Sequence, residues 1–191
     1  GSQHAAGWNP SVPGLRVEWN DECKTGWWDG FIGPGKAFDT DRYFIICANF
    51  LGGCYGSTGP GSENPSTGRP YGSGFPVVEF SDIVHSQLLL LDHLGIERLH
   101  AAAGASIGGL LCLELASAAR ERIGRLVLLA TGSSVTPLQR VLNFEQITAI
   151  ESDGDFQGGD YYPGSGPVRG LCLARMIAHK TFISLEALGE R

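Results

Sequence analysis

Apolar positions along the chain follow two patterns: short continuous apolar runs, and longer runs in which apolar residues recur at helical spacing. The short runs at 43–49 and 125–130 are typical of strands buried on both faces, and a run of small residues at 99–104 predicts a third strand. The longer runs predict helices at 81–93, 107–119, 137–150 and 168–181. Because strands and helices alternate through residues 43–150, the pattern predicts an α/β fold with a mainly parallel sheet.

The helix predicted at 81–93 shows how the pattern sets the limits of an element. Ile83 and Leu91 lie on one helical face with other leucines. Ser81 and Asp82 are suited to cap the helix and to place acidic charge in its first turn. Gly95 fits the end of the helix, where a left-handed residue is common.

Glycine is the unusual feature of the composition, with 28 residues clustered between the apolar segments. Such clusters predict tight turns and close backbone approaches. Residues 1–40 show little periodicity and predict a long ordered loop. After residue 150 the composition becomes rich in Gly, Asp and Tyr, and a further helix is expected from Ser184. Residues 151–191 are therefore predicted to begin a helical lid, and residues 1–150 to form the central part of the core.

Charge and cysteine content restrict the possible partners. The net charge is −6, which argues against a nucleic-acid binder and against docking on an anionic membrane. No apolar run is long enough to span a bilayer. The five cysteines contain no Cys-x-x-Cys pair, so buried, reduced thiols in a cytoplasmic protein are expected, with no disulfide frame and no metal site.

The sequence from Gly104 to Gly108, Gly-Ala-Ser-Ile-Gly, matches the pattern of a nucleophile elbow. It lies between a short strand and an apolar helix, as that motif requires. The central Ser106 would occupy a sharp, strained turn and act as the nucleophile, and side chains at 104 or 108 are expected to clash. The helix that begins at Ile107 directs its N-terminal dipole at this point, so the Ile107 backbone N–H is expected to stabilise an oxyanion.

Two other motifs carry less weight. Residues 30–37 nearly match a phosphate-binding loop, but Ala37 stands where magnesium binding needs Ser or Thr, so a plain turn is expected. In the elbow motif an acid and then a histidine follow the serine, and His179 is the only histidine after Ser106. A pairing of Asp160 with His179 stays open at this point, although His179 falls inside a predicted helix. His4 could also lie near the site.

The sequence resembles the homoserine O-acetyltransferase family, within the α/β-hydrolase superfamily. The resemblance covers almost the whole chain and is most specific between residues 26 and 72. The matching stretches are 1–7, 26–39, 49–60, 64–72, 75–78, 89–97, 104–109, 158–162 and 173–179. The resemblance implies an α/β-hydrolase fold with a helical lid.

The resemblance also implies a ping-pong reaction. Ser106 would attack the thioester of acetyl-CoA, and the hydroxyl of homoserine would then attack the acyl-serine, a step of methionine biosynthesis. Arg175 matches the family arginine that binds the α-carboxylate of the substrate, a task that suits a guanidinium. Acetyl-CoA would be a co-substrate with no cofactor bound, and the residues that bind it are not identified. The implied partners are therefore small molecules, acyl-CoA and homoserine, and the parent protein is expected to be a homodimer.

Three departures from the family pattern affect the substrates more than the chemistry. Phe182 stands where the family usually has Tyr, so a hydroxyl contact is lost. Ala105 and Ile107 stand where Gly and Met are common. The alternatives are therefore serine as acceptor, succinyl-CoA as donor, a simple serine esterase of the same fold, and an inactive remnant that acts only through association.

The resemblance predicts that the chain is a fragment and that its fold is incomplete. Family members have further strands and a second oxyanion donor before the residues that match 1–7. Their triad Asp and His follow the residues that match Arg191. Because the nucleophile would lack its base, the isolated chain is expected to be inactive.

Overall fold

The computed structural model describes residues 4–12, 19–182, 184, 186 and 189. The chain divides into two compact units. One unit comprises Gly1–Gly59, Pro76–His100 and Glu114–Arg125, and the other Pro60–Phe75, Ala101–Leu113 and Leu126–Arg191. The elements in chain order are α1 Asp21–Lys24, β1 Ile32–Gly33, β2 Phe38–Asp39, β3 Glu63–Asn64, β4 Arg69–Pro70, η1 Gly72–Gly74, α2 Phe80–His93, β5 Ala102–Ala105, α3 Ile107–Ala118, η2 Arg120–Arg122, β6 Leu126–Leu129, α4 Pro137–Glu151, η3 Gln157–Gly159 and α5 Val168–His179.

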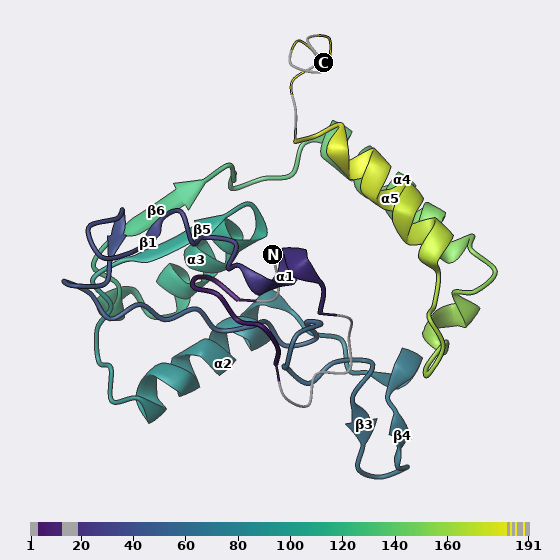
Figure 1. Ribbon diagram of the computed structural model, residues 1–191, viewed down its shortest axis with the longest axis horizontal. Helices are drawn as coiled ribbons and strands as arrows, with labels where there is room; N and C mark the ends of the chain where they lie inside the picture. The colour runs from purple at the N-terminus through teal and green to yellow at the C-terminus, as the bar shows by residue number, and fades with distance from the viewer. Residues whose placement is uncertain (1–3, 13–18, 183, 185, 187–188, 190–191) are drawn as a thin grey trace. The chain divides into compact units, whose positions relative to one another are not determined.

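The central feature is the parallel pair β5–β6, joined through α3 (Figure 1). Its register pairs Ala102 with Leu126 and Ala105 with Leu129. Parallel strands need a crossover, and α3 supplies it with Leu111 and Cys112 buried. This confirms the predicted strand–helix–strand order through residues 99–130.

The helix α2 begins one residue earlier than predicted. Its N-cap is Glu79, whose backbone N–H donates to Asp82 Oδ2 at 2.9 Å. Ser81 is therefore not part of the cap, whereas Asp82 takes part in it as the N3 residue of a capping box and also supplies the acid of the first turn. Ile83 and Leu91 are buried as expected, and Gly95 follows the helix with φ +69°.

Two expected features of the sheet are not found. Residues 43–49 lie outside any strand, and Phe44 is 78% exposed. A strand exists only through its ladder, and no described residue pairs with this segment. The strand β6 does form, but its residues are 36–46% exposed, so the prediction of a buried strand was wrong. Its described partner is β5 alone, so the other edge of β6 has no partner among the described residues.

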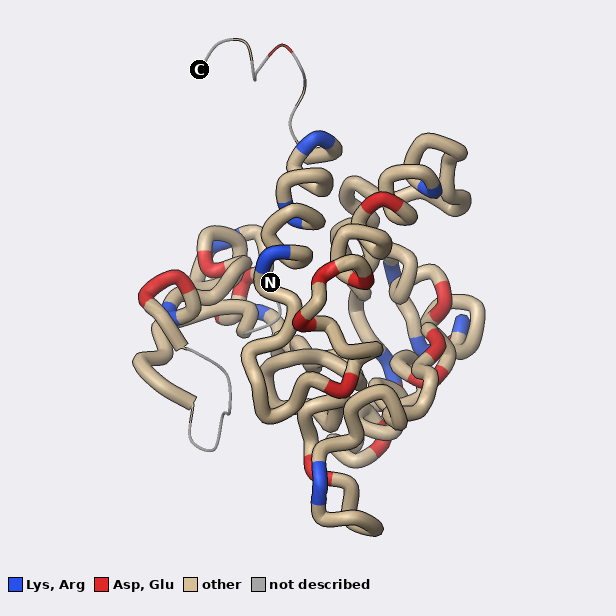
Figure 2. Tube along the Cα trace, turned by 90° about the vertical axis from the view of Figure 1, so that its right-hand side faces the viewer, with Lys and Arg blue, Asp and Glu red and all other residues tan. Residues whose placement is uncertain are grey.

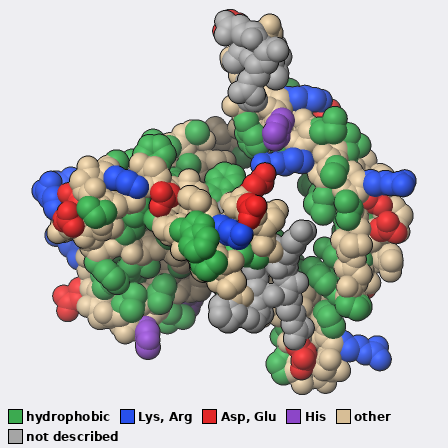
Figure 3. Space-filling view, viewed as in Figure 1, with side chains coloured by type: hydrophobic (Ala, Val, Ile, Leu, Met, Phe, Trp, Pro, Cys, Tyr) green, Lys and Arg blue, Asp and Glu red, His purple; other side chains and the backbone are tan. Residues whose placement is uncertain are grey.

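The helices α4 and α5 pack along each other (Figure 1). Gly170 makes the close approach possible, because a Cβ there would lie 2.6 Å from the Ala149 carbonyl oxygen. Hydrophobic side chains gather over this helix pair (Figure 3), and among them Phe144 is 70% and Met176 68% exposed. The predicted domain boundary at residue 150 stays a prediction, as does the lid assignment.

The first forty residues, where described, are mostly irregular around α1, β1 and β2, as expected for a long ordered loop. The expected helix from Ser184 lies largely outside the described residues. Lys and Arg residues, like Asp and Glu residues, are spread along the trace (Figure 2). Within the described part of the chain, no helix combines the length and the apolar character that crossing a membrane requires.

Candidate active site

Ser106 is the single residue between β5 and α3. It has φ +53°, in the left-handed region that residues with a side chain rarely adopt. The residue is exposed at the carboxyl end of the strand. The structure therefore contains the sharp, strained strand-to-helix turn that the Gly-x-Ser-x-Gly pattern predicts.

Backbone hydrogen bonds hold this turn from both sides. The Ser106 N–H donates to the Leu129 carbonyl oxygen of β6 at 2.9 Å. The Ser106 carbonyl oxygen accepts from the N–H groups of Gly109 at 2.9 Å and Leu110 at 3.3 Å. Both backbone polar groups of the strained residue are thus satisfied, which stabilises its conformation.

The glycines around the serine have different roles. A Cβ on Gly104 would overlap the Gly108 carbonyl oxygen and lie 2.7 Å from the Gly109 nitrogen, so the expected clash at position 104 is confirmed. A Cβ on Gly108 would meet nothing within 4 Å, so the expected clash there was wrong. The close position is Gly109, where a Cβ would lie 2.8 Å from the Thr131 Cβ.

The backbone N–H of Ile107 is the first of α3, a helix of 12 residues. N–H groups in the first turn of a helix have no partner within it and carry the positive end of its dipole. A negative charge that develops beside Ser106 would be stabilised there. The role of Ile107 as an oxyanion donor stays a prediction that this geometry supports.

Arg175 lies exposed on α5, next to Phe182. The Arg175 Cζ is 5.8 Å from the centre of the Phe182 ring, within the range of a cation–π contact. The His179 ring centre is 6.0 Å from the same ring. Positions 175 and 182 are therefore neighbours, and the phenyl ring supports the guanidinium from one side.

The open pairing of Asp160 with His179 is not what the structure forms. Both carboxylate oxygens of Asp160 accept from Ser73, Oδ1 from its N–H at 2.7 Å and Oδ2 from its hydroxyl at 2.8 Å. The Ser73 N–H, and then its hydroxyl, hold the pKa of Asp160 below its ordinary value. His179 instead lies against Phe182. Asp160 thus serves to join η1 and η3.

His4 has contacts of its own. The Nε2 of His4 lies 3.0 Å from the Cys23 carbonyl oxygen, and its ring lies beside Trp19. His85 and His93 are exposed on α2. Among the described residues, no three His, Cys, Asp or Glu side chains gather in a way that could hold a metal ion.

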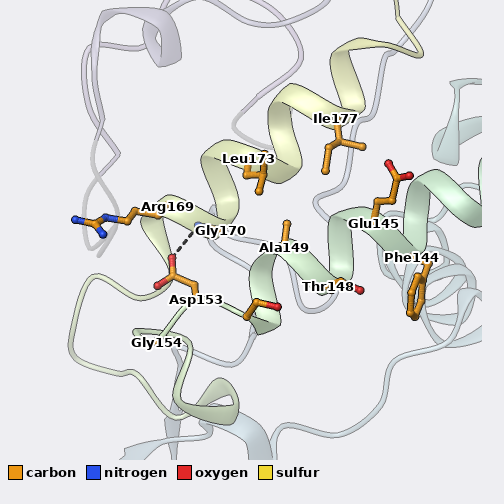
Figure 4. A pocket seen from close by; sticks show the side chains of 11 residues that line it. Phe144, Glu145, Thr148, Ala149, Asp153, Gly154, Arg169, Gly170, Leu173 and Ile177 are labelled. Atoms are coloured by element: carbon orange, nitrogen blue, oxygen red, sulfur yellow. Dashed lines mark hydrogen bonds between the residues drawn. The ribbon is translucent and has the colours of Figure 1, made fainter.

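A groove of about 630 Å³ runs between α4 and α5 (Figure 4). Its lining includes Phe144, Leu173 and Ile177, with Asp153 and Arg169 at one end. The predicted site residues Ser106, Ile107 and Arg175 do not line it. Its size alone does not make it the active site, because the predicted chemistry lies at the end of β5.

Two features of the site escaped sequence reasoning. Thr131 packs on Gly109, and Ala130 between β6 and Thr131 has φ +48°. The second glycine of the Gly108–Gly109 pair was a signal of a close approach. The local sequence does not indicate which residue makes this approach, because Thr131 follows the end of the next strand, β6.

The sequence profile of the family described as "alpha/beta hydrolase fold" matches residues 22–182, most of the chain. The chain belongs to the alpha/beta hydrolase fold family. The predicted fold class is therefore confirmed, and the strained Ser106 turn lies within the matched residues.

Curated relatives support the narrower resemblance to acyltransferases. The homoserine O-acetyltransferase of Methanosphaerula palustris is 49% identical over 96% of this chain and 36% of the relative. The homoserine O-succinyltransferase of an Azoarcus species is 45% identical over 100% of this chain and 49% of the relative. The chain thus spans between about a third and a half of the length of these relatives.

Solved structures of the same fold include a transferase and an esterase. The homoserine O-acetyltransferase from Bacillus anthracis matches with a TM-score of 0.76 and 37% identity, over 81% of this chain and 43% of that one. Esterase E22 matches with a TM-score of 0.84 and 30% identity, over 99% of this chain and 50% of that one. Both reactions are therefore found on backbones similar to this one.

Proposed function

We propose that the protein containing this chain transfers an acetyl group from acetyl-CoA to the hydroxyl of homoserine through an acyl-enzyme on Ser106. The observation that carries this is the left-handed Ser106 at the junction of β5 and α3. The identity of 49% to a homoserine O-acetyltransferase supports the choice of substrates. The implied partners are small molecules, and a homodimer is the proposed assembly.

In the first half-reaction the Ser106 Oγ attacks the thioester carbonyl carbon of acetyl-CoA, and its proton passes to a base. The tetrahedral oxyanion lies at the mouth of α3, where the Ile107 N–H donates to it. Collapse of this intermediate breaks the C–S bond, and the CoA thiolate leaves and takes up a proton. An ester on Ser106 remains. No described residue is assigned as the base.

In the second half-reaction the homoserine hydroxyl attacks the acyl-serine and gives its proton to the base. The bond between the acyl carbon and the Ser106 oxygen breaks, and the serine recovers a proton. Arg175 binds the α-carboxylate of the acceptor with its exposed guanidinium. This contact places the hydroxyl for attack and favours homoserine over water.

A serine esterase is the second candidate, because esterase E22 shares the backbone over almost the whole chain. The two functions differ in what the acyl-enzyme meets. A transferase forms O-acetylhomoserine in preference to acetate, whereas an esterase forms acetate whether or not homoserine is present. Succinyl-CoA as donor remains the variant within the transferase class, since one relative is a homoserine O-succinyltransferase.

The test is Ser106→Ala in the protein that contains this chain. Release of CoA that depends on homoserine should fall by about 10⁴-fold or more, because the covalent route is lost. Mass spectrometry should detect an acetyl group on Ser106 in the wild type incubated with acetyl-CoA alone. Ser165→Ala, at an exposed serine before α5, is the matched control and should keep the activity.

Three outcomes would contradict this proposal. Full activity in the Ser106→Ala variant would exclude the acyl-serine route. Acetate as the main product at saturating homoserine would favour the esterase. A faster reaction with succinyl-CoA than with acetyl-CoA would replace the donor and leave the mechanism intact.

A further inference from the structure

The segment between Asp160 and Glu186 is cationic, although the chain as a whole has a net charge of −6. No Asp or Glu occurs between these two residues, whereas Arg169, Arg175 and Lys180 do. Figure 2 shows blue segments that recur, without red, along the helix leading to the C-terminus, which is α5. Positive charge therefore prevails along this helix and at Lys180, which directly follows it.

The three cations lie on the side of α5 that faces away from α4, and all three residues are exposed. Because a helix turns by about 100° per residue, Arg169 and Lys180 lie about 20° apart around its axis, and Arg175 lies about 120° from Arg169. The opposite side of the helix packs along α4 (Figure 1) and holds the buried residues Gly170, Ala174 and Ile177. Arg169, Arg175 and Lys180 thus form one surface, the basic face of α5.

The basic face has no acidic partner among the described residues. The ion pairs in the described part of the chain join aspartates to other cations, namely Lys24, Lys36 and Arg122. Asp153 precedes α5, but its Oδ2 accepts the Gly170 N–H at 2.7 Å. Figure 4 shows the Arg169 guanidinium extending away from the groove between α4 and α5. The charges of this face are therefore available to an anion from solution.

We propose that the basic face of α5 binds the phosphate groups of acyl-CoA, with Arg169 and Lys180 as the contacts. Coenzyme A carries a diphosphate and a 3′-phosphate, and a long arm separates both from the thioester. A guanidinium binds a phosphate through two N–H groups, and an ammonium binds one as a point charge. The two positions are about 16 Å apart along the helix axis, so their long side chains can reach different phosphates of one molecule.

This inference rests on the proposed function, because it takes acyl-CoA as the donor. Both substrates of the proposed reaction are anions, and Arg175 lies between the two phosphate contacts. It is about 9 Å along the helix axis from Arg169 and about 7.5 Å from Lys180. In the ping-pong order CoA leaves before homoserine binds, so one basic face serves the phosphates of the donor first and the carboxylate of the acceptor afterwards.

The experiment compares two acetyl donors in the protein that contains this chain, at low ionic strength, where charge contacts are least screened. S-acetylpantetheine has the same thioester as acetyl-CoA but no phosphate. Arg169→Gln and Lys180→Gln should each lower kcat/KM for acetyl-CoA about tenfold, the effect of one lost charge-assisted hydrogen bond. The double variant should lose the preference for acetyl-CoA over S-acetylpantetheine. Arg140→Gln is the matched control: it removes the same charge from an exposed arginine of α4 and should keep that preference.

Binding of CoA to Ser106→Ala, measured by isothermal titration calorimetry, separates this inference from the proposed function. Binding that weakens when Arg169→Gln and Lys180→Gln are added supports the basic face as the site. If CoA binds equally well with and without these two substitutions, the donor stands and the inference is overturned. If CoA does not bind to Ser106→Ala at all, acyl-CoA is not the donor and the proposed function fails as well.

Two kinetic results would also overturn the inference. An equal loss of kcat/KM with acetyl-CoA and with S-acetylpantetheine would mean that the substitutions act on something other than phosphate binding. A rise in the KM for homoserine, with kcat/KM for acetyl-CoA unchanged, would assign Arg169 and Lys180 to the acceptor.

Discussion

Ser106 and Ala130 are non-glycine residues in the left-handed region, each after a parallel strand. Such a conformation costs on the order of 1–3 kcal/mol per residue and is retained where neighbours determine it. Here the Leu129–Ser106 hydrogen bond and the Gly109–Thr131 contact hold the two residues in this conformation. Strain at a nucleophile keeps its hydroxyl exposed at the strand end, where a substrate can reach it.

Substitution of Phe182 tests whether its ring orients the Arg175 guanidinium. Phe182→Leu removes the ring that lies 5.8 Å from the Arg175 Cζ. An exposed cation–π contact contributes about 0.5–1 kcal/mol, so the KM for homoserine should rise about two- to fivefold with kcat little changed. Phe182→Tyr keeps the ring and should hold or lower that KM. Steady-state kinetics with homoserine as the varied substrate measures both.

The control for this substitution is Phe144→Leu, at another exposed phenylalanine, which lines the α4–α5 groove. It should leave the KM for homoserine unchanged. Arg175→Ala sets the scale and should raise that KM more than Phe182→Leu does. An equal KM in wild type and Phe182→Leu would mean that the ring does not orient the guanidinium.

At this scale the sequence predicted the conformation of Ser106 and the need for glycine at 104. Both follow from a local pattern of strand, turn and helix. It placed the second close approach at Gly108, one residue from the true position at Gly109. A side chain at position 109 would collide with Thr131, which follows a different strand. A contact of this kind leaves no periodic pattern in the sequence near residue 109.

The pairing of α4 with α5 depends on Asp153, which follows the end of α4 and caps the start of α5. The Asp153 Oδ2 accepts the Gly170 N–H of α5 at 2.7 Å (Figure 4), and its Oδ1 accepts the Asp155 N–H at 3.1 Å. Gly170 lies in the first turn of α5, where N–H groups lack partners within the helix. The contact therefore stabilises the start of α5 and its pairing with α4.

Asp153→Asn should loosen the start of α5 at neutral pH. The N–H groups of Gly170 and then Asp155 hold the pKa of Asp153 below its ordinary value of 3.8. A carboxylate with a lowered pKa stabilises the fold above the ordinary value, and this contribution is lost as the pH falls through the lowered one. The difference between wild type and variant should thus be full at pH 7 and disappear well below pH 3.8. Hydrogen exchange of the Gly170 amide measures it.

Asp155→Asn is the matched control, because Asp155 takes part through its backbone N–H. It should exchange like the wild type throughout. Protection of Gly170 that is the same in wild type and Asp153→Asn at pH 7 would rule out the capping role.

The order of elements from β5 to α5 was predictable because each has a strong period or a clear cap. Thr136 and Gln139 form a capping box before α4, and Pro137 begins that helix. The segment 43–49 was not predictable in the same way. Its β-branched and aromatic composition favours a strand, but a strand forms only with a ladder partner, which composition cannot report. The exposure of β6 was not predictable for the same reason, because composition cannot report which segments lie against a strand.

At the scale of the whole molecule, the described residues form two compact units, and α3 contributes to both. Serine acyl transfer needs a nucleophile, a base and an oxyanion site acting together. The described residues supply a strained serine and one N–H donor at a helix start. Among the described residues, no base forms a hydrogen bond with the Ser106 hydroxyl: Asp160 accepts from Ser73, and the His179 ring lies against Phe182.

The isolated 191-residue chain should therefore show no measurable acetyl transfer to homoserine. If no base accepts the serine proton, the rate should be lower by about 10⁴-fold or more than in a complete triad enzyme. The measurement is CoA release by the purified chain, compared with the protein that contains it. Turnover by the chain that disappears in both Ser106→Ala and His179→Ala would contradict this expectation. It would require His179 to leave Phe182 and accept the proton of the serine, either alone or with Asp160 released from Ser73.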